Sequence, residues 1–359
     1  MILSARFESQ SLVGFPVFRY SNCKYKNVTP VSAYPNNQWE MLSLPNRWAL
    51  AGAWLLLVCF TVFLALTPLN GIPVLPRILE LFGKRILPEN AIYSPLAYMI
   101  MLTLVVWGEL RTPARKQKIL SVALLQDFWW YASNIFVYII FISAFIAMLD
   151  GIYTRYLGFL TIESAQSWHP LVRFVVAVLV SDFLRWFSHL LRHKVPLFWA
   201  FHSVHHSQQE LNAFSVNRVH PVDSLLSKII QFIPLLAFQN AFPIVMLWVL
   251  IETMYSKYYH ANIAINLGRL RYVLVTPQSH RIHHSSDARH QDLNYGFTFS
   301  IWDRLFGTQS PDDTIYPETG IDDSVFPLEK VYKPWAFLVC WWSQLIYPFT
   351  YLYSNQARR

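Results

Sequence analysis

Long apolar runs alternate with short polar connections through the first half of the chain. Three of these runs contain no charged side chain and lie at residues 49–66, 91–107 and 128–149. A fourth, residues 171–191, is interrupted by Arg173, Asp182 and Arg185. Runs of this kind are typical of helices that cross a hydrocarbon core of about 30 Å. The pattern predicts a transmembrane scaffold over residues 48–169, without chemistry of its own, and a further membrane helix after it.

A later apolar run, residues 229–251, has a different pattern. It contains Pro234 and Pro243, with the polar pair Gln239 and Asn240 between them. Proline ends or begins helices more readily than it continues them. The run can be one straight span, or a hairpin that turns at residues 239–242. We predict the hairpin, because a straight span would carry His260 away from the other histidines of the chain.

The remaining segments are more polar and give weaker patterns. Residues 1–47 are irregular and predict a poorly ordered leader; a cleavable signal peptide is disfavoured, because the first apolar run begins late and is long. Residues 268–276 are expected to be extended, and residues 292–308 to cover a site. In the last part, 309–359, a loop is followed by an apolar helix at 336–353, which either spans the membrane or lies in its interface.

Composition supports the membrane reading. Of the 359 residues, 54% are hydrophobic and only 14% are charged, and the mean hydropathy is +0.29. The three cysteines, Cys23, Cys59 and Cys340, are far apart and predict neither a disulfide framework nor a thiolate metal site.

The net charge of +8 indicates orientation more than a nucleic-acid partner. The connection after the second run holds Arg111, Arg115, Lys116 and Lys118, and basic connections face the cytosol. Following the spans from there places the histidine segments on the cytosolic side. We therefore expect a multi-pass protein of the endoplasmic reticulum or a bacterial inner membrane, with membrane lipids around it and no nucleic acid bound.

Histidines carry the strongest motif in the sequence. The pattern HxxxH occurs at His189 and His193, and the pattern HxxHH occurs twice. Residues three and four apart share a helix face, so each motif is a candidate metal-binding face. With His260 between the two HxxHH copies, the candidate ligands are His189, His193, His202, His205, His206, His260, His280, His283 and His284.

Nine imidazoles exceed the needs of one ion, because a zinc site uses three or four ligands and an octahedral ion uses six. The count therefore predicts two metals. Imidazole suits iron, copper, zinc and nickel alike, so it does not choose between them. His169 and His290 are expected to have no ligand role. His220 is open: it is a tenth ligand, a surface residue, or, as we favour, a partner that orients a ligand.

Three further polar residues are candidates for positioning the ligands. Asp182 lies seven residues before His189, on the same helix face, and either orients that imidazole or pairs with Arg185. Asp292 and Asn294 follow the last histidine motif closely enough to hydrogen-bond its imidazoles or to hold a metal-bound water, although both are also common in turns.

Residues 170–308 resemble the fatty acid hydroxylase and sterol desaturase superfamily of membrane-bound oxygenases. The resemblance rests on the order of the three histidine motifs and on their flanks DFLRWFSHLLRH, FHSVHHS, RVHP, HAN, TPQSHRIHHSSDARHQDLNYG and WDRLFGT. It implies that the nine histidines hold two irons and that 170–308 is the catalytic domain. It also implies an all-α integral membrane protein, with about four transmembrane helices in two hairpins beneath a cytosolic histidine-rich cap.

The resemblance implies an activity as well: O2 is activated at the two irons, and a C–H bond of a lipid is hydroxylated or desaturated. The sequence contains no haem, nucleotide-binding or cysteine-cluster motif of its own, so electrons are expected from a separate donor, either cytochrome b5-like or ferredoxin-type. Two rivals are a membrane metal-binding or metal-transport protein and a zinc-dependent hydrolase. The hydrolase is disfavoured because HExxH is absent, and a transporter would hold its ligands at mid-membrane.

Overall fold

The structure is a computed structural model that describes residues 68–69, 72–73, 93–118, 121–238, 242–329 and 334–356. The predicted leader and the first apolar run lie outside these residues. The described part is helical apart from a minimal antiparallel hairpin of β1 (Pro68–Leu69) and β2 (Ile72–Pro73). The all-α class is therefore confirmed for the described residues.

The second and third apolar runs form α3 (Tyr93–Arg111) and α4 (Val122–Ile152). Helix α4 begins where the Ser121 side chain accepts a hydrogen bond from the backbone N–H of Leu124, which satisfies one of the amides left without a partner at a helix start. Beyond α4, the chain makes short turns of π and 3-10 helix, η1 (Tyr153–Leu157), η2 (Gly158–Leu160) and η3 (Glu163–Ser167).

Helix α5 (Pro170–Lys194) carries the first histidine motif, and α6 (Pro196–His206) follows it directly. Both begin with proline, which fits the first turn of a helix and cannot continue one. Among the described helices, α5 is the one that is long and apolar enough to cross a membrane by length and composition. The topology of about four spans beneath a cytosolic cap stays a prediction.

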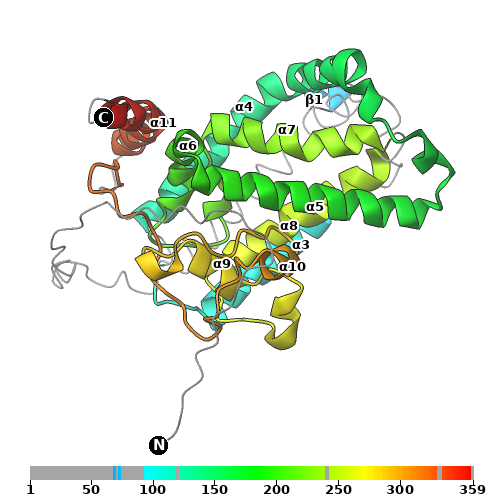
Figure 1. The fold of residues 1–359 in the computed structure, drawn as a ribbon. Helices are drawn as coiled ribbons and strands as arrows, with labels where there is room; N and C mark the ends of the chain where they lie inside the picture. The colour runs from blue at the N-terminus through cyan, green and yellow to red at the C-terminus, as the bar shows by residue number, and fades with distance from the viewer. Residues whose placement is uncertain are drawn as a thin grey trace, which may run out of the picture. The chain divides into compact units, whose positions relative to one another are not determined.

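The fifth apolar run is broken into two helices, α7 (Pro221–Ala237) and α8 (Phe242–His260). This break was predicted from the two prolines and is confirmed, although the turn itself lies outside the described residues. Helix α7 runs beside α5 (Figure 1). Helix α8 ends at His260, next to α9 (Pro277–His283), which carries the third histidine motif.

The expectation of an extended segment at 268–276 is wrong for its first half. Residues Gly268–Tyr272 form the 3-10 helix η5, entered through left-handed backbone at Leu267 and Gly268. Only Leu274, which bridges to Phe299, pairs as a strand would. Helix α9 then begins with a reciprocal cap between Thr276 and Ser279. Two short helices follow, η6 (Ala288–His290) and α10 (Ile301–Leu305).

The C-terminal apolar segment is helical, as predicted, and forms α11 (Pro334–Gln356). It contacts α4 and α6. The Trp130 indole of α4 donates to Gln344 Oε1 at 2.8 Å, and Tyr347 packs in a buried cluster with Val204 of α6. The hydrogen bond explains why the polar residue Gln344 lies in this apolar helix. It does not decide whether α11 spans the membrane or lies in its interface.

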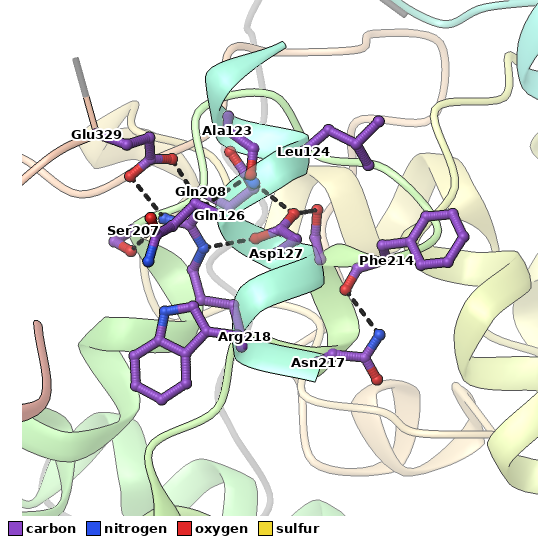
Figure 2. Close-up of polar contacts among 12 residues, drawn as sticks. Ala123, Leu124, Gln126, Asp127, Ser207, Gln208, Phe214, Asn217, Arg218 and Glu329 are labelled. Atoms are coloured by element: carbon purple, nitrogen blue, oxygen red, sulfur yellow. Dashed lines mark hydrogen bonds and ion pairs between the residues drawn. The ribbon is translucent and has the colours of Figure 1, made fainter. Parts of the chain in front are cut away.

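A buried ionic network joins α4 to the segment that follows α6 (Figure 2). Arg218 and Asp127 are both fully buried, and Arg218 Nε donates to Asp127 Oδ1 at 2.7 Å. Arg218 also donates to Glu329 at 2.7 Å and to the carbonyl oxygen of Ala123. Because every one of these groups is buried and partnered, the backbone of Arg218 is held in one position.

Candidate metal centre

The structure brings all nine candidate histidines together, in two groups. Within each group, the candidate ligand nitrogens lie within 4.8 Å of one another. The first group contains His189, His193, His202, His206 and His283. The second group contains His205, His260, His280 and His284.

Helix geometry divides each HxxHH motif between the two groups. His202 and His206 are four residues apart on α6 and turn to the first group, whereas His205 turns to the second. The copy on α9 is divided the other way, because His280 and His284 face the second group and His283 faces the first. Residues four apart share a helix face and adjacent residues do not, so two short helices each serve both groups.

Hydrogen bonds to Nδ1 fix the tautomers of five imidazoles. The acceptors are four backbone carbonyl oxygens and one carboxylate, and an acceptor there requires that Nδ1 carries the proton. The bonds are His189 to Tyr295 O at 2.8 Å, His283 to Leu293 O at 2.8 Å, His260 to Ser256 O at 2.8 Å, His205 to Arg218 O at 3.2 Å, and His202 to Asp223 Oδ2 at 2.9 Å.

As a result, unprotonated Nε2 atoms face one another. His189 Nε2 lies 3.0 Å from Nε2 of His283 and 3.0 Å from Nε2 of His202. In the second group, His260 Nε2 lies 3.2 Å from Nε2 of His205. With the protons held at Nδ1, neither nitrogen of such a pair can donate to the other. The lone pairs therefore converge on a point where a metal cation would satisfy them.

The spacing also fits a metal ion. Two imidazole nitrogens bound at about 2.1 Å and at right angles to each other lie about 3.0 Å apart. Further buried ring nitrogens have no hydrogen-bond partner among the described residues, and they belong to the same groups: His193 Nε2, His206 Nε2, His280 Nδ1 and His284 Nδ1. A buried polar atom without a partner is costly, and a bound metal would satisfy His193 Nε2 and His206 Nε2. His280 and His284 instead turn Nε2 toward the other ligands of the second group.

Burial keeps these imidazoles neutral, as metal binding requires. Removal from water, followed by the proximity of the other histidines, holds the pKa values of His206, His280 and His284 well below the ordinary 6.5. The same burial lowers the pKa of His283 to about 3. Asp223 opposes the effect at His202, whose pKa is lowered less strongly.

The loop 292–295 positions two ligands through its backbone. Asp292 and Asn294 adopt left-handed conformations, with φ of 65° and 58°, and the carbonyl groups of the alternate residues, Leu293 and Tyr295, accept the Nδ1 protons of His283 and His189. The Asp292 side chain pairs with Lys194 at 2.6 Å. The Asn294 side chain bonds to the backbone of Ser279 and Ser310.

Of the alternatives left open for Asp292 and Asn294, the turn role is the one that the backbone supports. Neither side chain hydrogen-bonds a candidate ligand. Their residue types matter because Asn and Asp tolerate left-handed backbone, and that backbone turns successive carbonyl groups toward the metal centre.

Asp182 also has partners other than those expected. It accepts hydrogen bonds from the backbone N–H groups of Thr298 and Phe299 and from the Trp302 indole. Arg185, the alternative partner, instead forms an ion pair with Glu252 of α8. Asp182 thus anchors the segment that follows the 292–295 loop to α5, and it does not hydrogen-bond His189.

The three remaining histidines lie outside both groups. His220 accepts from the Val222 amide and so caps α7, and its Nε2 lies 3.1 Å from the carbonyl oxygen of Leu345; neither the ligand role nor the orienting role that we favoured has a contact here. His169 caps α5 in the same way. His290 is buried between Ser285 and Asp312.

Two acidic residues important to the centre were not singled out from the sequence. Asp223 holds His202 and also pairs with Arg192 at 3.3 Å. Asp303 accepts from the backbone N–H groups of Tyr295 and Gly296 and from the Trp186 indole, so it fixes the 292–295 loop at its far end. Two sequence features could have pointed to these residues: Asp223 lies in the first turn of α7, and Asp303 lies in the motif WDRLFGT.

Two adjoining groups of buried, neutral, preoriented imidazoles in a helical protein could hold metal ions, as a histidine-rich metal centre does. Residues 174–308 match the family described as fatty acid hydroxylase. This segment, over which the chain is similar to that family, contains all nine candidate ligands. No solved structure matches the chain.

Curated relatives agree with the family. The chain is 32% identical to the ornithine lipid hydroxylase OlsE of Rhizobium tropici over 40% of its own length and 43% of the relative's. It is 32% identical to the alkylglycerol monooxygenase of Homo sapiens over 41% of its own length and 31% of the relative's. It is 29% identical to methylsterol monooxygenase 1 of Gallus gallus over 41% of its own length and 50% of the relative's. The matches thus span half or less of each relative's length.

Proposed function

We propose that the chain is a membrane-bound oxygenase that uses O2 and external electrons to hydroxylate or desaturate a C–H bond of a lipid. Two irons, one in each histidine group, would supply the reduction of O2 that an attack on an unactivated C–H bond requires. The relatives named above are hydroxylases or monooxygenases of lipids. Their names lend no support to a transporter or a zinc hydrolase.

The observation that carries the proposal is the convergence of unprotonated Nε2 atoms in both groups. His189, His202 and His283 present such atoms in the first group, and His205 and His260 in the second. The nine histidines are the proposed ligands. Their acceptors at Nδ1 hold each ring at a fixed angle, and such partners typically change metal affinity by about 10- to 100-fold.

The protein's own contribution is position and exclusion of water. All nine ligands are buried or half-buried, and no carboxylate belongs to either group, in contrast to ferritin-like bundles that use Glu and His. Proposed roles for the remaining parts follow from the sequence. Residues 170–308 are the catalytic domain, residues 48–169 a membrane scaffold, and basic residues near the cap suit an acidic electron donor.

Metal analysis of the purified chain tests the proposal. We expect close to two irons per chain, and O2-dependent modification of a membrane lipid when a reductant and donor are supplied. His283→Ala should abolish turnover while the protein still inserts. The matched control is His169→Ala, which removes only an exposed helix cap worth about 1 kcal/mol. One zinc without iron, or full turnover by His283→Ala, would contradict the proposal.

A further inference from the structure

A cavity of about 170 Å³ adjoins both histidine groups. Its walls come from α5, α7, α8 and α9 and include His189 and His202 of the first group and His205, His260 and His280 of the second. The cavity is therefore the space in which a substrate could reach both metals at once.

The same cavity has a charged wall within helices of apolar composition. Arg185 and Arg192 of α5 and Lys228 of α7 line it, together with Asp223 of α7 and Glu252 of α8. Charged side chains within membrane-type helices are costly and tend to mark functional sites. Here they stand beside residues of both histidine groups.

The cavity wall is rich in cationic donors. Arg192 pairs with Asp223, and Arg185 pairs with Glu252. Arg192 is only 5% exposed, yet its Nε and Nη2 have no hydrogen-bond partner among the described residues. Buried donors of this kind call for an acceptor, and a guanidinium suits the oxygens of a carboxylate or phosphate.

Phe297 holds the two guanidinium groups in place. Its ring centroid lies 4.1 Å from the Cζ atom of Arg185 and 5.6 Å from that of Arg192. Such contacts restrict the guanidinium planes without using their N–H donors. The Nε and Nη2 donors of Arg192 thus stay available to a ligand in the cavity.

Size limits how much of a lipid can enter. A volume of 170 Å³ holds roughly six groups of the size of a water molecule, which is less than a sterol or a whole acyl chain. Arg192 pairs with Asp223, and the same carboxylate accepts a hydrogen bond from Nδ1 of His202. A head group bound at Arg192 would therefore place its first few carbons at the histidines.

We propose that this cavity binds the head group of a lipid substrate that carries anionic oxygens, a carboxylate or a phosphate, and that the carbon oxidised lies within a few bonds of that head group. The inference rests on the proposed oxygenase function and names the substrate class. Arg192, Arg185 and Lys228 recognise the anion, and the tail remains outside along the helices.

Equilibrium binding of three probes with the same twelve-carbon chain tests this inference. The iron-loaded protein in a non-ionic detergent is dialysed against dodecyl phosphate, dodecanoate or dodecanol, without reductant, and the uptake by protein-free micelles is subtracted. We expect at least tenfold tighter binding of one or both anions than of dodecanol. Whether the phosphate or the carboxylate binds more tightly then identifies the head group.

Variants separate recognition from folding. Lys228→Gln should weaken anion binding about tenfold and leave dodecanol unaffected, whereas Lys116→Gln, at an exposed position, should change neither. Arg185→Gln combined with Glu252→Gln removes a whole pair, so no unpaired buried charge remains, and should also weaken anion binding. Equal affinity for the alcohol and the anions, or an unchanged anion affinity in both cavity variants, would overturn the inference. A chain without iron would overturn the oxygenase proposal instead.

Discussion

His202 and Asp223 are joined by a hydrogen bond of 2.9 Å between Nδ1 and Oδ2, although α6 and α7 carry them on separate helices. The same carboxylate pairs with Arg192 of α5. One buried acid thus links three helices, orients a candidate ligand, and neutralises a cation beside the cavity. Among the five Nδ1 anchors, it is the one that supplies a negative charge.

Asp223→Asn should weaken the metal centre without removing any ligand. The amide can still accept a hydrogen bond, but the charge that strengthens the imidazole as a donor is lost and Arg192 is left without its counter-ion. We expect about 10- to 100-fold weaker metal binding, measured as metal retained against increasing chelator. Asp322→Asn, at an exposed position, is the control, and equal retention by both variants would contradict the prediction.

The left-handed backbone at Asn294 gives a second prediction. Asn294→Ala loses two hydrogen bonds and places alanine at φ 58°, a conformation that costs a residue with a Cβ roughly 1–2 kcal/mol. Asn294→Gly loses the hydrogen bonds but not the backbone conformation. We therefore expect the alanine variant to unfold at a lower temperature than the glycine variant, and to retain less metal. The reverse order would show that backbone conformation is not what this asparagine provides.

Gly296, which follows the same loop directly, has no space for a side chain. A Cβ there would lie 2.9 Å from the carbonyl oxygen of Phe299 and 2.8 Å from Val275 Cγ2, closer than such atoms approach. Gly296→Ala should displace the loop that anchors His189 and lower both stability and metal content. Gly151→Ala is the matched control, because nothing lies within 4 Å of its Cβ. In that helix, alanine should leave stability unchanged or raise it by about 0.5–1 kcal/mol.

The metal-free protein should lose stability as the pH falls below 6.5. The pKa of His283 is about 3 in the folded protein and near 6.5 in an unfolded chain. Below 6.5 the unfolded state therefore binds more protons, and the free energy of unfolding decreases. At pH 5.5 this histidine alone accounts for about 1.4 kcal/mol. Thermal unfolding at pH 7.5, 6.5 and 5.5 measures the effect, and His283→Gln should reduce the slope. A pH-independent unfolding temperature would contradict it.

Sequence spacing identified which histidines come together, but not how they are divided between the two groups. A motif such as HxxHH shows that His202 and His206 lie on one helix face, whereas the partner of His205 depends on where α8 returns. The Nδ1 acceptors were harder to predict, because most are backbone carbonyl groups, which every residue has. Asp182 illustrates the same limit: its partners lie more than a hundred residues further along the chain, and only packing brings them together.

The orientation of the cap gives the last prediction. The hairpin of α7 and α8 returns His260 to the other ligands, so residue 265 must lie on the same side of the membrane as the histidine groups. The basic connection at 111–118 predicts that this side is the cytosol. A small epitope tag inserted after residue 265, in the connection beyond α8, should be labelled only after the membrane is permeabilised. A second tag in the connection at 161–167 should be labelled in intact cells or sealed vesicles and serves as the control. A tag at 265 that is accessible from outside would place the cap on the other face, and would require the electron donor to be extracytoplasmic.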